Sequence, residues 1–219
     1  MNPQTLELLL AGEYLCEYRY PEAWQTLQDL AEREAVDGWL RRLGMRLARV
    51  GDTGAFFMAP EGVTEKVAAK LRGELREFRD TYGPALLMLD FIRQTNGEMA
   101  LCSPGERIQL VALESHVTNS TTLAAQLRDL VQNTIRGGSA RFTDRENLRK
   151  LMDHLASDGY VTLADRATET YQVTGKVEQL YAVLTFLDEN KVIDDQEVHD
   201  QLDLADEPAE PGESNGTSP

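Results

Sequence analysis

Two stretches of the chain, roughly a hundred residues apart, contain the same order of local structure signals. Residues 41–60, RRLGMRLARVGDTGAFFMAP, combine a helix that ends at Gly44 with two short apolar runs around a Gly-Asp-Thr-Gly turn. Residues 148–175, LRKLMDHLASDGYVTLADRATETYQVTG, combine a helix that ends at Gly159 with two runs around residues 165–169. Glycine and aspartate tolerate the positive φ of tight hairpin turns. The sequence therefore predicts a helix followed by a β-hairpin, twice in one chain.

The spacing of apolar residues predicts several helices around these hairpins. In the first half we expect helices at 3–11, from Pro21 through Leu30 and Ala31, and at 34–43, strands at 45–50 and 55–59, and a helix that begins at Thr64. In the second half we expect helices at 85–94, from the Ser-Pro-Gly-Glu start at Ser103, within 118–135, from the Thr143–Glu146 capping box, and at 175–189.

This order of elements is typical of winged-helix units. We therefore predict a mainly α fold with small β-hairpin wings, in the α+β class, built as tandem winged-helix domains. The predicted boundaries are 1–82 for the first domain and 83–190 for the second. Residues 191–219 are predicted to form a disordered acidic tail, because this segment has too few apolar residues to offset the entropy of ordering.

The formal net charge of −15 is spread unevenly. Eleven acidic residues and Lys191 give the segment 188–219 a charge of −10, which leaves −5 for residues 1–187. The acidity of the whole chain argues against nucleic acid as a partner, but most of that acidity lies near one end. Nucleic-acid contact by residues 1–187 therefore stays open.

The sequence lacks the motifs of common enzyme classes. It contains no P-loop, no G-x-S-x-G and no G-x-G-x-x-G, and its three histidines are far apart. We expect no catalytic residues, no metal and no cofactor. Cys16 and Cys102 are expected to be buried thiols in the cytosol, since the N-terminus lacks a secretory signal and its apolar stretch is too short to span a membrane.

Two groups of basic residues are candidate DNA contacts. They consist of Arg41, Arg42, Arg46 and Arg49 in the first half, and Arg128, Arg141, Arg145, Arg149 and Lys150 in the second. Such side chains can neutralise phosphates, although they can equally form a solvated face paired with nearby acids. Acids on the helix that begins near Asp144 disfavour sequence-specific reading of bases.

The order of these parts also resembles a known family. Residues 144–175, DRENLRKLMDHLASDGYVTLADRATETYQVTG, look like the second winged helix of the kleisin-interacting MksE and MukE subunits of bacterial condensins. Residues 75–94, LREFRDTYGPALLMLDFIRQ, are similar to the helix that opens this domain in that group. The likeness extends over roughly residues 40–190, and the acidic tail adds to it.

The resemblance implies a homodimeric, non-enzymatic subunit of a condensin of the MksBEF type. It would bind the kleisin subunit MksF, join the SMC ATPase MksB through the kleisin, and help engage DNA weakly and without sequence specificity. The expected location is the cytoplasm, at the nucleoid, with no membrane contact, and the expected role is chromosome organisation or plasmid defence. A dimeric winged-helix transcription regulator and a protein-only adaptor without DNA contact remain as alternatives.

Overall fold

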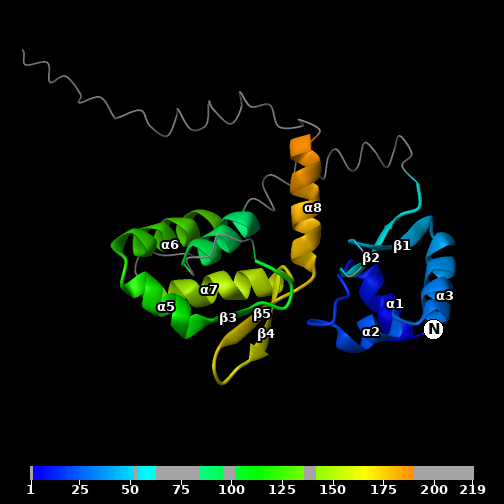
Figure 1. Ribbon diagram of the computed structural model, residues 1–219, viewed down its shortest axis with the longest axis horizontal. Coiled ribbons are helices and arrows are strands. Elements are labelled where there is room, and N and C mark those ends of the chain that lie inside the picture. Colours follow the sequence, from blue (N-terminus) through cyan, green and yellow to red (C-terminus); the bar gives the residue numbers. More distant parts are fainter. Residues whose placement is uncertain (1, 52–53, 63–83, 96–101, 136–141, 190–219) are drawn as a thin grey trace, which may run out of the picture. The chain divides into compact units, whose positions relative to one another are not determined.

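A computed structural model describes residues 2–51, 54–62, 84–95, 102–135 and 142–189. Contacts between residues divide the chain into two units, Met1–Leu180 and Tyr181–Pro219. Figure 1 shows that the described elements are mostly helices, with two small groups of strands. Both groups of strands form antiparallel sheets. The predicted mainly α fold with small β-hairpins is therefore confirmed.

The N-terminal part of the chain consists of three short helices and a hairpin. Its elements are α1 (Pro3–Leu10), α2 (Pro21–Thr26), α3 (Leu30–Arg41), β1 (Met45–Arg49) and β2 (Phe56–Pro60). The side chain of Asn2 caps α1 by accepting a hydrogen bond from the backbone N–H of Gln4 at 3.0 Å. Proline in the first turn suits both α1 and α2, because that N–H has no partner inside the helix.

A small apolar core holds these elements together. Three leucines are fully buried in it, namely Leu9 of α1, Leu27 directly after α2 and Leu40 of α3. Leu15 joins the hairpin as an isolated bridge, because its backbone exchanges two hydrogen bonds with Phe56, at 2.8 and 2.9 Å. Helix α3 therefore leads directly into a hairpin that is fixed to the same core.

The C-terminal part repeats this plan with a larger sheet. Residues 84–95 are helical, and the elements that follow are β3 (Arg107–Gln109), α5 (Leu110–Thr118), α6 (Thr121–Thr134), α7 (Asp144–Ser157), β4 (Val161–Asp165), β5 (Thr170–Val173) and α8 (Lys176–Glu189). The strand order is β3-β5-β4, and both pairs are antiparallel. Helices α5, α6 and α7 pack on one another.

Helix α7 follows its sequence signals closely. The predicted capping box is present, since Thr143 accepts from the backbone of Glu146 and the Glu146 carboxylate accepts from the N–H of Thr143 at 2.8 Å. The predicted apolar stripe is completely buried and consists of Leu148, Leu151, Met152 and Leu155. One face of α7 therefore belongs to the core, and the other carries charged residues.

The helix expected from Ser103 does not begin there. Residues 103–106 form a turn, in which the backbone N–H of Ser103 donates to the Glu106 carboxylate at 3.0 Å and Gly105 has a φ of +86°. Ile108 then pairs with Tyr171 as part of strand β3, and α5 begins at Leu110. The left-handed Gly105 and the strand partner override the local helix signal, as tertiary context often does.

The other sequence expectations have different outcomes. The helix expected at 34–43 is α3, which begins earlier, at Leu30, because the Asp29 side chain caps it by accepting from Glu32 N–H at 3.0 Å. Cys16 and Cys102 are buried thiols, as predicted. The helix expected from Thr64 and the residues 191–219 lie outside the described residues. The domain boundaries at 82 and 190 stay predictions.

Candidate functional site

The first predicted basic cluster follows the end of α3 and strand β1, and it contains Arg41, Arg42, Arg46 and Arg49. Arg41 is engaged in ion pairs with Asp37 at 2.8 Å and with Glu61 at 3.2 Å. Asp37 also accepts the backbone N–H of Leu47 at 2.9 Å, and the hydrogen bond from Arg41 is the main cause of its lowered pKa. Arg41 therefore takes part in fastening the hairpin to α3.

Arg42 and Arg46 differ from Arg41 in their surroundings. Both are exposed, and within the described residues neither forms an ion pair. Arg46 acts on Asp37 only as a nearby charge. Arg42 directly follows α3 and Arg46 lies in β1. Both are more exposed than Arg49, which is half-buried and donates to the carbonyl oxygen of Gly54.

The arginines of α7 are paired with acids from two other elements. Arg145 forms ion pairs with Glu114 of α5 and with Glu169 of the β4–β5 turn. Arg149 donates to Glu169 as well, from Nε to Oε1 at 3.0 Å. We call these four residues the α7 charge cluster. It joins α5, α7 and the hairpin, and in this arrangement its arginines are neutralised.

The remaining positions of the second basic group are also placed by the structure, except one. Arg128 forms an ion pair with Asp144 at 3.0 Å, and the Lys150 ammonium lies 3.7 Å from the centre of the Phe142 ring. Arg141 lies outside the described residues. The acids that pair with the arginines of this group were visible in the sequence, but they lie on α5, on α7 and in the hairpin, and no local signal assigned them to their partners.

Glu169 has an unusual conformation for its position. Its φ of +47° is left-handed, which is uncommon for a residue with a side chain. Its carboxylate accepts hydrogen bonds from Arg149 and Arg145, and these, with Arg149 first, hold its pKa below the ordinary value. The two arginine contacts give a reason for the strained backbone at this turn.

Substitution of Glu169 by glutamine is expected to remove a pH-dependent part of the stability. A carboxylate with a lowered folded-state pKa stabilises the fold fully above the ordinary glutamate pKa of about 4.3, and this contribution is lost as the pH falls through the folded value. The thermal midpoints of wild type and Glu169→Gln should therefore converge on acidification. Glu34→Gln, an exposed change on α3, serves as the control and should run parallel to wild type. If the difference in thermal midpoint between wild type and Glu169→Gln stays constant as the pH falls, the prediction is contradicted.

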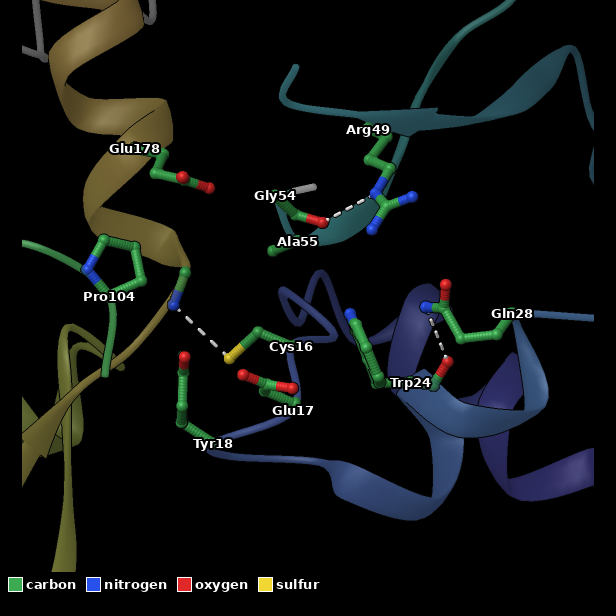
Figure 2. A pocket seen from close by; sticks show the side chains of 11 residues that line it. Cys16, Glu17, Tyr18, Trp24, Gln28, Arg49, Gly54, Ala55, Pro104 and Glu178 are labelled. Atoms are coloured by element: carbon green, nitrogen blue, oxygen red, sulfur yellow. Dashed lines mark hydrogen bonds between the residues drawn. The ribbon is translucent and has the colours of Figure 1, made fainter. Parts of the chain in front are cut away.

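A pocket of about 570 Å³ lies within the Met1–Leu180 unit. Figure 2 shows Trp24, Arg49, Glu178 and Cys16 around it. The backbone N–H of Gly175 donates to the Cys16 Sγ at 3.3 Å, which connects the segment after α1 with the start of α8. No sequence signal indicates this pocket, because its lining comes from segments that are far apart along the chain.

Comparison with known families gives a clear result. The family model described as condensin complex protein MksE matches residues 2–189. This range includes both helix-and-hairpin parts and the helix α8. The chain belongs to the MksE family. A search of curated proteins returned no match.

Membership in the MksE family makes the chain a subunit of a condensin complex. The expected resemblance is thereby confirmed at the level of the family. In the described residues, no helix is long and apolar enough to cross a membrane, and no three His, Cys, Asp or Glu side chains gather as metal ligands would.

Proposed function

We propose that this chain is a non-enzymatic accessory subunit of a bacterial SMC complex of the MksBEF type. It binds the kleisin subunit, joins the SMC ATPase through the kleisin, and helps to hold DNA. It works as a homodimer in the cytoplasm, at the nucleoid, in chromosome organisation or plasmid defence. The observation that carries the proposal is the family match over residues 2–189.

The order of elements supports the tandem winged-helix part of this proposal. Each part of the chain has helices that lead into an antiparallel hairpin, first α3 with β1–β2 and then α7 with β4–β5. The second sheet has a third strand, β3, whereas in the first part Leu15 forms an isolated bridge to Phe56. The edge of a small sheet can pair with a strand of a partner protein.

Exposed apolar side chains support contact with partner proteins. Leu10, Leu30 and Leu43 are 48%, 60% and 53% exposed, although each lies in or beside a helix of the N-terminal part. A stable interface buries roughly 800 Å² on each partner. Side chains of this kind supply apolar area for a kleisin segment or for a second copy of the chain.

DNA contact is proposed as weak, sensitive to salt and independent of sequence. Arg42 and Arg46 are exposed charges without ion pairs in the described parts of the chain. Each phosphate contact releases counterions, so the affinity falls as the salt concentration rises. Inside an SMC complex a weak contact is sufficient, because tethering raises the local concentration of DNA.

A second candidate is a protein-only adaptor of the same complex. The ion pairs of the α7 charge cluster and the net charge of −15 favour it, because both reduce attraction to phosphates. The adaptor keeps the kleisin contact but predicts no change in DNA binding when arginines are substituted. The transcription-regulator alternative is disfavoured, since α7 presents paired arginines together with acidic side chains.

Affinity purification of the tagged full chain from its native cells tests the proposal. Recovery of a kleisin and a long coiled-coil ATPase, identified by mass spectrometry, is the expected result. Recovery of the protein alone, bound to a specific duplex site, would overturn the proposal in favour of a regulator. A kleisin-containing complex that retains no DNA would support the adaptor.

A further inference from the structure

The pocket within the Met1–Leu180 unit has the composition of a site for a cation. We infer that it receives a basic side chain, arginine or lysine, from a partner protein. The inference rests on the proposed function, since it names the chemistry of a partner contact. The volume of about 570 Å³ lies within the range of roughly 300–1,000 Å³ that is usual for ligand pockets.

The carboxyl group of Glu178 is the part of the pocket lining whose hydrogen bonding is incomplete among the described residues. Its Oε2 atom is buried and, in the described residues, accepts no hydrogen bond. Burial raises the pKa of Glu178, while Arg49 lowers it by a smaller amount. A buried acceptor without a donor is costly, and a charged donor from a ligand would remove that cost.

The position of this carboxyl group depends on a glycine in the neighbouring turn. Gly54 lies directly against it, and a Cβ at Gly54 would overlap both Glu178 Oε2 and the carbonyl oxygen of Val50. The absence of a side chain at Gly54 therefore makes room for the carboxyl group at the pocket wall. Figure 2 shows Glu178 directed toward Gly54.

Arg49, a basic residue of the pocket lining, has its own contacts within the chain. Arg49 donates from Nε to the carbonyl oxygen of Gly54 at 2.9 Å, and its guanidinium lies 4.5 Å from the centre of the Phe56 ring. Two acids, Glu17 and Glu178, line the same pocket. The charged lining therefore has an excess of one negative charge. Its arginine, Arg49, already contacts the Gly54 carbonyl oxygen and the Phe56 ring.

Aromatic side chains complete the match to a basic side chain. Trp24 and Tyr18 both line the pocket. A hydrogen bond with Glu17 is the main cause that raises the pKa of Tyr18 to about 12, so its ring stays neutral at physiological pH. Indole and phenol faces attract cations, and a guanidinium can stack on them while it donates to a carboxylate.

Nuclear magnetic resonance on the ¹⁵N-labelled full chain tests the inference with Nα-acetyl-arginine-N-methylamide as the probe. The ionic strength is held constant with sodium chloride. We expect saturable shifts at Gly54, Ala55, Gly175 and the Trp24 indole, with a dissociation constant on the order of millimolar. The lysine analogue should bind at the same signals. The citrulline analogue, which is neutral and nearly isosteric, should bind at least about tenfold more weakly.

The variant Glu178→Gln should weaken binding of the arginine probe by about fivefold or more. Glu34→Gln, which makes the same change on an exposed part of α3, should leave it unchanged. If Glu178→Gln does not fold, the pH dependence in wild type replaces it. Binding should weaken on acidification as Glu178 becomes protonated, with Glu17, Tyr18, Arg49 and Cys16 as the other titratable groups that face the pocket.

Three results would overturn the inference. These are shifts that do not saturate, shifts outside the pocket, and equal binding of the arginine and citrulline probes. The affinity purification separates this failure from failure of the proposed function. A wild-type chain that recovers the kleisin but does not bind the probe retains the function and loses only the inference. If both are correct, Glu178→Gln should also recover several-fold less kleisin than Glu34→Gln.

Discussion

Replacing Arg42 and Arg46 together with glutamine is expected to weaken binding of the chain to a short DNA duplex by about tenfold at 0.1 M salt. The two guanidinium groups are exposed and, among the described residues, form no ion pair. Each lost phosphate contact should reduce the slope of log affinity against log salt by about 0.9, so the double variant should lose roughly two units of slope. Fluorescence anisotropy of a labelled duplex across a salt series measures both quantities.

The control for this experiment removes the same net charge from another surface. Arg145→Gln combined with Arg149→Gln also deletes two positive charges, but both arginines are paired with Glu169, and Arg145 with Glu114 as well. We expect the salt slope of this variant to stay close to that of wild type. Equal losses in the two double variants would show that only net charge matters. A loss confined to the α7 variant would place the DNA contact on α7 and contradict the prediction.

The sequence was sufficient to predict those parts of the fold that depend on neighbours along the chain. The stripe that contains Leu148 and Leu155 and the cap at Thr143 are local patterns, and α7 has them as predicted. The hairpin strands lie within a residue of the expected ranges, because glycine and aspartate determine the turn and alternation determines the strands. Local signals thus identified most helices and both hairpins.

The parts that sequence reasoning missed depend on contacts between distant segments. Ile108 was expected in a helix, but its pairing with Tyr171 makes it part of a strand. The candidate site also depends on distant contacts. The basic residues can be read from the sequence, but the acids with which they form ion pairs could not be assigned to them. Glu169 follows Arg145 by 24 positions and neutralises it through the folded hairpin. Charge counts along a sequence therefore overestimate the number of arginines that are available to DNA.

The pocket illustrates the limit most clearly. Cys16 and Gly175 are 159 positions apart and share a hydrogen bond in the structure. Glu178 lies on a helix whose apolar spacing was recognised. Nothing in that spacing shows that the Glu178 Oε2 atom accepts no hydrogen bond from the part of the chain that the structure describes. A site of this kind is found only when the packing of separate segments is known.

Leu151→Ala is expected to cause the largest loss of stability, about 2–5 kcal/mol. Leu151 is completely buried in the core face of α7, and truncation removes apolar contacts and leaves a cavity that the surrounding helices can fill only in part. At roughly 2–4 °C per kcal/mol for a chain of this size, the midpoint of thermal unfolding should fall by about 4–20 °C. Circular dichroism at 222 nm during heating measures the midpoint.

Two further variants show whether this loss comes from the core. Leu151→Met conserves most of the volume and should cost less than about 1.5 kcal/mol. Leu163→Ala removes a leucine that is 41% exposed on β4, and it should cost much less than Leu151→Ala. Leu151 lies on the buried face of α7 and does not contact solvent. At temperatures where the Leu151→Ala variant is folded, the slope of log DNA affinity against log salt should therefore equal that of wild type. A change in that slope would mean that α7 takes part directly in the DNA contact. If Leu163→Ala lowers the stability as much as Leu151→Ala, the assignment of the core is contradicted.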